Sequence, residues 1–258
     1  PSPPPRFVLS PRGAAKAAAL AQEFPANVRV AGSNQEVVDA ADCVVLAVLG
    51  TQAEDVLGAL TFREGQQVLS LIASVKLGRL RELAAPATEC AIGVPLPAVA
   101  KRQGATLLMP SRPFARKIFD ILGSCVAVED EAQFKRMQSV TALMGDFYKR
   151  QLTAQEWLQS HGVPRTEAGA WIGAMYATIA ADSARAGPTT FESLVAEQTP
   201  GGLNEMVWRD QEEDANYKAV EYSLDVVHHR LMTGTTEPDL APAAKRAKAG
   251  VSPPNGTA

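Results

Sequence analysis

The run CVVLAV at Cys43–Val48 is the most apolar part of the chain and points to its fold class. A strand that reads as an unbroken apolar run is typical of a parallel sheet with both faces covered. The segment NVRVA at Asn27–Ala31 precedes it and QVLSLIA at Gln67–Ala73 follows it, and a helical pattern separates each of them from it. Strands that alternate with helices predict βαβ crossovers and an open, doubly wound α/β sheet.

The same alternation extends in both directions along the chain. A short strand, RFVLS at Arg6–Ser10, is followed by an Ala-rich helix at Gly13–Phe24. Two further helices are expected to be capped by Ser33 or Asn34 and by Thr51, because hydroxyl and amide side chains cap helix N-termini. The remaining expected elements, in chain order, are a helix at Leu77–Leu83, strands near Cys90–Ile92 and at Thr106–Met109, a helix at Arg112–Gly123 and a strand at Ser124–Val128.

Strand signals stop after Glu129, and apolar residues then recur at helical spacing as far as Leu231. This change predicts an α/β domain at 6–129 and an all-helical domain at 130–232. Residues 1–5 are rich in proline, and residues 233–258 contain almost no large apolar residue. We therefore expect both ends of the chain to be disordered.

Composition excludes several classes of protein. The 258-residue chain has a formal net charge of −3, so it lacks the basic footprint of a nucleic-acid-binding protein, and an apolar content of 46% is too high for a disordered chain. Its three cysteines lack the spacing of a zinc site or a disulfide framework. No apolar run approaches the roughly 20 residues that span a bilayer. We expect a cytoplasmic protein with no metal, nucleic acid or membrane partner.

The end of the first expected strand is a candidate cofactor site. Doubly wound sheets bind ligands at the carboxyl ends of their strands. The chain contains no GxGxxG motif, but Ser10 and Arg12 stand where the second strand of a dinucleotide-binding sheet meets the ribose. An arginine there suits the 2′-phosphate of NADP, and Ser10 adds a hydroxyl donor. The alternative is that Arg12 is a solvated turn residue.

The stretch TPGGLNEMVW at Thr199–Trp208 is the second candidate site. Gly201 and Gly202 allow backbone N–H groups to approach a ligand closely. The start of the helix that follows favours an anion such as a carboxylate. The alternative is a plain turn between two helices, in which the glycines only form the caps.

These two stretches, in this order, resemble pyrroline-5-carboxylate reductases, and the similarity runs from Arg6 to about Met232. TPGGLN is similar to the family's S-P-G-G-T-T and is the most specific match. The other similar segments, in the family's order, are FVLSPRGAAKAAALA, VVLAVLGTQAEDVLGAL, VLSLIASVKLGRL, VPLPAVAKRQGATLL, SVTALMG and GVPRTEA. The resemblance implies a Rossmann-like dinucleotide-binding domain and a helical domain that dimerises by interleaving.

The resemblance also implies a function, the reduction of a cyclic imine carboxylate by NAD(P)H to proline or a proline-like product in proline biosynthesis. It favours NADP(H) over NAD(H) and needs no metal. The implied cofactor-binding residues are Ser10, Arg12, Ala47, Val48, Ala73 and Ser74. The implied substrate-binding residues are Thr199, Gly201 and Gly202, contributed by the partner subunit of a homodimer or higher homo-oligomer, with Asn204 as the catalytic residue near the imine nitrogen.

The departures from the family pattern concern the same sites. The family's first strand and glycine-rich loop have no counterpart before Arg6, so the chain resembles a divergent, N-terminally incomplete member. The family's Lys-Pro is Leu49-Gly50 here, and its M-P-N-T-P segment is shortened to Val94–Pro97. Asn204 replaces a threonine whose hydroxyl the family uses near the imine nitrogen. An amide donates a hydrogen bond but does not relay a proton equally well.

Two other functions stay open at this point. The absence of the glycine-rich loop favours a non-catalytic dimeric module derived from the family. The altered substrate segment favours a reductase of another small imine or of a hydroxy acid. Binding of NADPH discriminates between the module and the enzymes.

Overall fold

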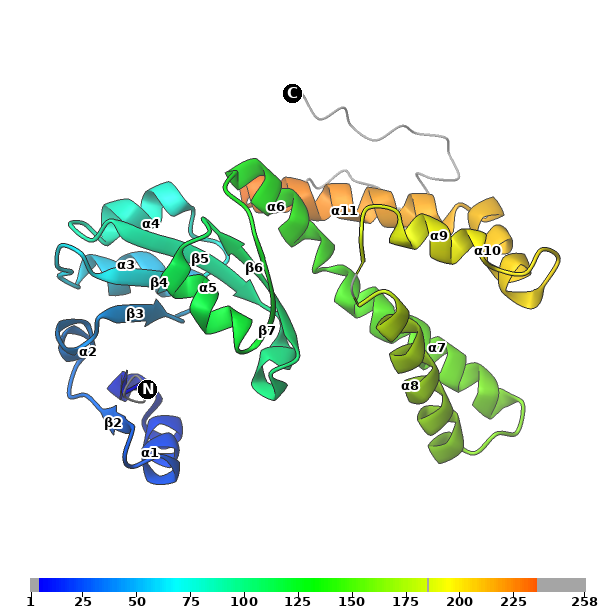
Figure 1. Ribbon diagram of the computed structural model, residues 1–258. Helices are drawn as coiled ribbons and strands as arrows, with labels where there is room; N and C mark the ends of the chain where they lie inside the picture. Colours follow the sequence, from blue (N-terminus) through cyan, green and yellow to red (C-terminus); the bar gives the residue numbers. More distant parts are fainter. Residues whose placement is uncertain (1–4, 185, 236–258) are drawn as a thin grey trace. The chain divides into compact units, whose positions relative to one another are not determined.

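A computed structural model describes residues 5–184 and 186–235 (Figure 1). The chain divides into two compact units, Pro1–Gln138 and Ser139–Ala258, and each is described separately. The proline-rich start and the C-terminal tail that the sequence predicts to be disordered lie almost entirely outside the described residues.

The first unit contains the expected alternation of strands and helices. Its strands are β1 (Phe7–Leu9), β2 (Val28–Val30), β3 (Cys43–Leu46), β4 (Gln67–Ser70), β5 (Glu89–Pro95), β6 (Gly104–Met109) and β7 (Gly123–Ala127). Its helices are α1 (Ala14–Glu23), α2 (Asn34–Ala40), α3 (Ala53–Gly58), α4 (Leu77–Leu83), α5 (Pro113–Asp120) and the first part of α6 (Glu131–Val140). Short 3-10 turns cover Pro11–Gly13, Gly50–Gln52 and Pro97–Lys101. The α/β class predicted from the sequence is confirmed, and the fold is Rossmann-like.

The strands form two sheets. Five strands pair in the order β3-β4-β5-β6-β7, and β1 pairs only with β2 (Figure 1). Pairing is parallel from β3 to β5, with Val45 opposite Leu69 and Leu69 opposite Ala91. Within the described residues, no strand joins β1 to β3, so the Rossmann-like sheet is interrupted between them. This matches the predicted lack of a first strand.

One strand pair differs from the expectation of βαβ crossovers throughout. Strands β5 and β6 are antiparallel, with Ile92 opposite Met109 and Pro95 opposite Thr106. Only the 3-10 turn Pro97–Lys101 lies between them. A connection this short permits an antiparallel return but not a parallel crossover, which needs a dozen or more residues.

The core lies between the central strands and their helices. In β4, Val68 and Leu69 point to opposite faces and both are fully buried, as a strand covered on both sides requires. In β3, Val44 and Leu46 are buried but Val45 is 49% exposed. The expectation that the Cys43–Val48 run is covered on both faces is therefore wrong for β3. It stands at the edge of the five-stranded sheet.

Of the two helix caps predicted from the sequence, one is confirmed and one is wrong. The hydroxyl of Ser33 accepts a hydrogen bond from the backbone N–H of Glu36 and caps α2, as expected. Thr51 does not cap a helix, because it lies inside the 3-10 turn Gly50–Gln52, and α3 begins only at Ala53. A residue inside a turn does not have the extended backbone that a capping residue needs.

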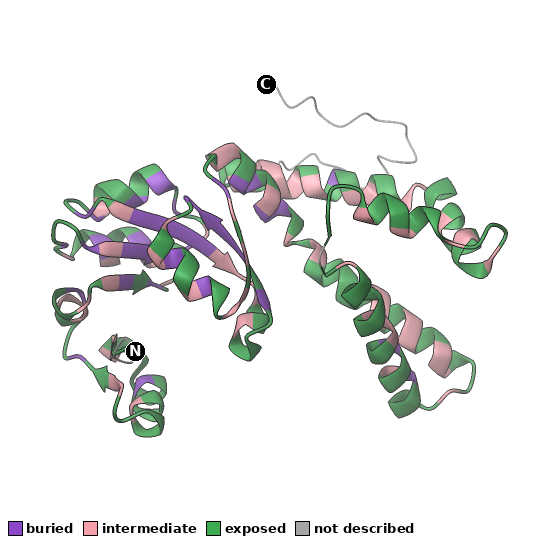
Figure 2. Cartoon of the chain, in the orientation of Figure 1, coloured by how far each residue is buried: buried purple, intermediate pink, exposed green. Residues whose placement is uncertain are grey.

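The second unit is all-helical, and much of its apolar side-chain surface is exposed. It contains the end of α6, α7 (Leu143–Ser160), α8 (Arg165–Asp182), α9 (Thr190–Ala196), α10 (Leu203–Glu213) and α11 (Asn216–Thr233). Helix α7 packs against α8, and α10 against α11. Figure 2 shows that most of its residues are exposed, and many of its large apolar residues are among them. In the part of the chain that the structure describes, no helix combines the length and the apolar character that a membrane span requires.

Candidate functional site

A cavity of about 520 Å³ lies in the first unit where β1 and β3 end. Ser10, Arg12 and Gly13 line it from the turn after β1, and Asn34 lines it from the start of α2. The opposite wall is the segment Val44–Leu49, with Gln52, Val56 and Leu60 behind it. The cavity therefore lies at the carboxyl ends of two strands, beside the interruption between the two sheets.

Four of the six residues expected to bind a cofactor line this one cavity. Ser10 and Arg12 come from the turn after β1, and Ala47 and Val48 directly follow β3. The sequence separation between the two pairs is large, so the fold itself brings them together. Ala73 and Ser74 do not line this cavity and belong to the turn after β4.

The polar groups of the cavity are held by local hydrogen bonds. The hydroxyl of Ser10 donates to Oδ1 of Asn34 at 2.7 Å and accepts from the backbone N–H of Arg12 at 3.3 Å. Ser10 thereby caps the 3-10 turn Pro11–Gly13. The guanidinium of Arg12 forms no ion pair or hydrogen bond with any residue in the described ranges. It is an exposed positive charge in the lining of the cavity.

The turn after β4 is packed against the turn after β3. A Cβ atom on Gly50 would overlap the hydroxyl oxygen of Ser74, so a larger residue at position 50 would require the Ser74 side chain to rotate away. This contact places Ser74 beside the segment Val44–Leu49 that lines the cavity.

Lys135 is a residue of this region that the sequence interpretation missed. Its Nζ donates to the backbone carbonyl of Ala73 at 3.1 Å and to Oε1 of Gln138 at 3.2 Å. The residue is only 4% exposed, and burial lowers the pKa of its ammonium group. Lys135, Gln138 and Ser139 are all buried polar residues, spaced as one face of a helix. This polar helix face is the sequence pattern from which a role for Lys135 could have been predicted.

The glycine turn of the second unit is occupied by its own side chains. Gly201 has a φ of +72°, and its N–H donates to Oε2 of Glu205 at 2.5 Å. This hydrogen bond, followed by the Arg209 guanidinium, lowers the pKa of Glu205. The N–H of Gly202 donates to the carbonyl of Thr199 at 2.8 Å, and Nδ2 of Asn204 donates to Oε1 of Gln198. A carboxylate therefore already binds at the start of α10.

No cluster in the described ranges has the composition of a metal centre. Groups of three or more His, Cys, Asp or Glu side chains close enough to hold an ion are absent there. Cys43, Cys90 and Cys125 are all unpaired, and burial raises the pKa of each thiol. None of the three has the lowered pKa of a reactive thiolate.

The chain was compared with family models, with curated sequences and with solved structures. Residues 5–74 match the family model described as NADP oxidoreductase, coenzyme F420-dependent, and this segment contains all six residues expected to bind a cofactor. No curated protein sequence matches the chain.

Solved structures match over most of the chain. A pyrroline-5-carboxylate reductase from Coxiella burnetii is 18% identical with a TM-score of 0.73, and the match covers 87% of each chain. The enzyme from Streptococcus pyogenes is 19% identical with a TM-score of 0.72 over 89% of this chain and 90% of that chain. A reductive aminase from Aspergillus terreus, in complex with NADPH and ethyl levulinate, is 18% identical with a TM-score of 0.54 over 93% and 88%. The chain therefore has the fold of the pyrroline-5-carboxylate reductases, as its sequence resemblance predicts.

Proposed function

We propose that this protein binds NADP(H) in the cavity between β1 and β3 and reduces a small cyclic imine carboxylate, giving proline or a proline-like product. The observation that carries this proposal is the convergence of Ser10, Arg12, Ala47 and Val48 on that cavity. The similar fold of a reductive aminase in complex with NADPH, and of two pyrroline-5-carboxylate reductases, supports it.

The cavity residues fit the phosphorylated ribose of NADP(H). The guanidinium of Arg12 has no competing acidic partner among the described residues, and a guanidinium pairs strongly with a phosphate dianion. The hydroxyl of Ser10 donates its single proton to Asn34 in this structure, so it must rotate away from Asn34 before it can donate to a phosphate. The chain contains no GxGxxG to cradle the pyrophosphate, so we expect weaker binding than in a chain that carries this motif.

The segment after β3 fits the other end of the cofactor. Ala47 and Val48 have short side chains, which leave room for the ribose of a nicotinamide next to the backbone. When bound, the cofactor would supply the hydride that the imine carbon accepts, and the imine nitrogen, protonated from water, would become the amine. Lys135 acts as a positioning residue, because it fixes the Ala73 carbonyl in the neighbouring turn. The chain thus contributes orientation rather than a strong acid.

The substrate carboxylate is proposed to bind at the glycine turn, with Thr199, Gly201 and Gly202 around it and Asn204 near the imine nitrogen. The present structure shows what such binding must displace. Glu205 already accepts the N–H of Gly201, so the substrate carboxylate and the Glu205 carboxylate compete for one donor.

The second unit is proposed to form the interface of a homodimer. Its exposed large apolar side chains include Phe147, Trp171, Phe191, Leu203 and Met206. This much apolar surface on a small helical unit marks an interaction surface. A dimer supplies the glycine turn from one subunit to the cofactor cavity of the other. The unpaired cysteines support a reducing compartment such as the cytoplasm.

Two observations favour a second candidate, a non-catalytic dimeric module. The pair β1–β2 is not joined to β3, and the donor at Gly201 is engaged internally. In that case the helical unit keeps its dimer interface while the sheet has lost the affinity for a nucleotide.

Titration of the full chain with NADPH and with NADH, followed by cofactor fluorescence, tests the proposal. We expect saturable binding with a lower Kd for NADPH, and oxidation of bound NADPH when a five-membered cyclic imine carboxylate is added. Failure of both cofactors to bind contradicts the enzyme and supports the module. Binding of a cofactor without turnover of cyclic imines contradicts the proposed reaction and supports only the proposed nucleotide-binding site.

A further inference from the structure

A second cavity, of about 430 Å³, lies at the opposite end of the five-stranded sheet from the β1–β3 cavity. Thr88 lines it directly before β5, and because β5 runs parallel to β4 and β3, its amino end lies away from their carboxyl ends. Ala85, Pro86 and Ala87 form an apolar side between α4 and β5. No part of the proposed cofactor site lines this cavity.

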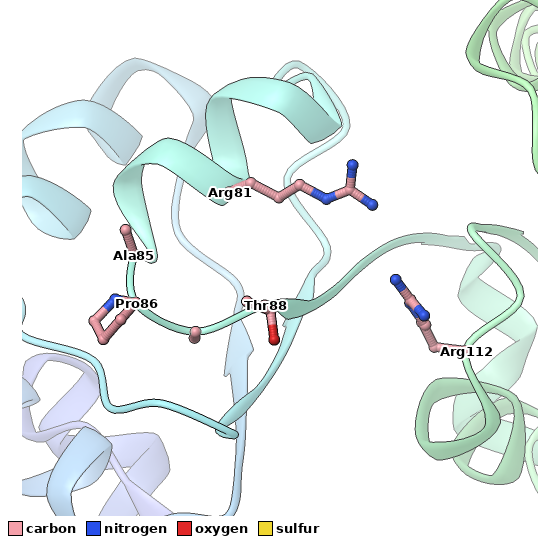
Figure 3. Close-up of a pocket in the computed structure, with 6 residues that line it drawn as sticks. Arg81, Ala85, Pro86, Thr88 and Arg112 are labelled. Carbon is pink, nitrogen blue, oxygen red and sulfur yellow. The ribbon is translucent and has the colours of Figure 1, made fainter.

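Two arginines project into this cavity from different elements. Arg81 comes from the last turn of α4, and Arg112 directly precedes α5. Figure 3 shows their guanidinium groups extending toward one another across the cavity. Both guanidiniums lower the pKa of the nearby Cys90 thiol against the effect of burial, so their charges act on the same small region.

The positive charge of this pair is incompletely balanced. Arg81 has no ion pair with any residue of the described ranges. Arg112 has Glu89 as a neighbour, with 3.8 Å between Nη1 and the carboxylate, which is too long for a hydrogen bond. The Nε atom of Arg112 is buried and has no hydrogen-bond partner. A buried donor without an acceptor is unfavourable, so the protein's own groups leave the Arg112 guanidinium incompletely satisfied.

We infer that this cavity binds a phosphate monoester of a small molecule, with its phosphate between Arg81 and Arg112. Two guanidiniums match the charge and the several acceptor oxygens of a phosphate dianion, and Thr88 lines the same cavity. The apolar side formed by Ala85, Pro86 and Ala87 contacts the organic group, which inorganic phosphate lacks. This site is independent of the proposed reductase function.

Calorimetric titration of the full chain with phenyl phosphate and with inorganic phosphate tests the inference. We expect phenyl phosphate to bind with a lower Kd than inorganic phosphate. Arg81→Gln should raise the Kd for phenyl phosphate about 10-fold or more, because a charge-assisted hydrogen bond is lost. Arg112→Lys keeps the charge but removes the planar guanidinium and its paired donors, and should raise this Kd by a smaller factor.

Two matched variants locate the binding. Arg116→Gln changes an arginine of α5 that pairs with Asp120 and should not alter the Kd for phenyl phosphate. Arg12→Ala removes the phosphate contact proposed for the other cavity, and the loss caused by Arg81→Gln should be the same in this background. Circular dichroism of each variant verifies the fold. An unchanged Kd in a folded Arg81→Gln protein, or an equal loss in Arg116→Gln, overturns the assignment. Equal affinities for phenyl phosphate and inorganic phosphate overturn the monoester, and an absence of binding at millimolar concentrations overturns the site.

Discussion

The ammonium group of Lys135 donates a 3.1 Å hydrogen bond to the backbone carbonyl of Ala73, and so ties α6 to the turn that follows β4. The two residues are 62 positions apart in the chain. The bond holds in place a turn that also contacts Gly50 through Ser74, beside the proposed cofactor cavity. A buried lysine thus links the first helix after the sheet to the carboxyl end of a central strand.

Lys135 should make the free energy of unfolding depend on pH in mildly alkaline solution. Burial lowers the pKa of this ammonium group in the folded protein below its usual 10.5, so the unfolded chain binds more protons between the two values. Stability therefore rises with pH through this window. In Lys135→Met the rise should be absent. Urea unfolding at intervals of pH up to about 10 measures the difference in slope.

The control for this prediction is Lys117→Met, which removes an exposed lysine from α5. It should leave the slope of the unfolding free energy against pH unchanged. A Lys135→Met protein with the same slope as the unmodified protein would show that the lysine keeps its ordinary pKa, and would contradict the prediction.

Arg12 should discriminate between the two nicotinamide cofactors. Because its guanidinium is proposed to contact the 2′-phosphate that NADPH has and NADH lacks, Arg12→Ala should raise the Kd for NADPH about 10-fold or more and leave that for NADH nearly unchanged. Arg6→Ala removes a charge from the opposite, amino end of β1 and outside the cavity, and should change neither Kd. Equal losses for both cofactors in Arg12→Ala rule out a contact with the 2′-phosphate.

Much of the α/β unit could be predicted because its signals are local. The apolar run of β3, the Ser33 cap of α2 and the bounds of α4 all depend on residues within one turn or strand. The exposed side of Val45 could not be predicted in this way. Its exposure depends on which element covers that face of β3, and a residue's own neighbours in sequence do not contain this information.

The same distinction holds for the candidate site. Residues marked by a local pattern could be predicted, and residues that act through a partner distant in sequence could not. Ser10 and Arg12 were accessible to sequence analysis because they end a strand, and strand ends bind ligands in this class of sheet. Lys135 and Glu205 were not, because each acts through a partner that only the folded chain brings near. Glu205 lies four residues after Gly201. The interpretation of this turn as a helix cap concerned the same segment but did not include Glu205.

Glu205 should stabilise the glycine turn in a pH-dependent way. The Gly201 N–H and the Arg209 guanidinium lower the pKa of its carboxyl group, so its contribution to the free energy of unfolding is present above the usual value of 4.5. It is lost as the pH falls through the lowered pKa. Glu205→Gln should therefore lower the Tm at pH 7, and the difference from the unmodified protein should shrink toward zero in acid. Thermal unfolding across this range measures it.

Glu213→Gln is the matched control, because Glu213 is exposed at the other end of the same helix α10. Its Tm should follow that of the unmodified protein at each pH. A Glu205→Gln protein whose Tm deficit persists undiminished below the lowered pKa would show that the carboxylate charge is not what holds Gly201.

The exposed apolar residues of the second unit should hold two copies of the chain together. Trp171 is 63% exposed on α8, and a large aromatic side chain in contact with water is an expected anchor of an interface. Sedimentation of the full chain should therefore give a dimer, and Trp171→Asp should shift it toward the monomer because a carboxylate is costly to bury. Thr166→Asp places the same charge at an exposed polar position of α8 and should leave the dimer intact. A well-folded monomer in the unmodified chain at micromolar concentration would remove both the interface and the sharing of the glycine turn between subunits.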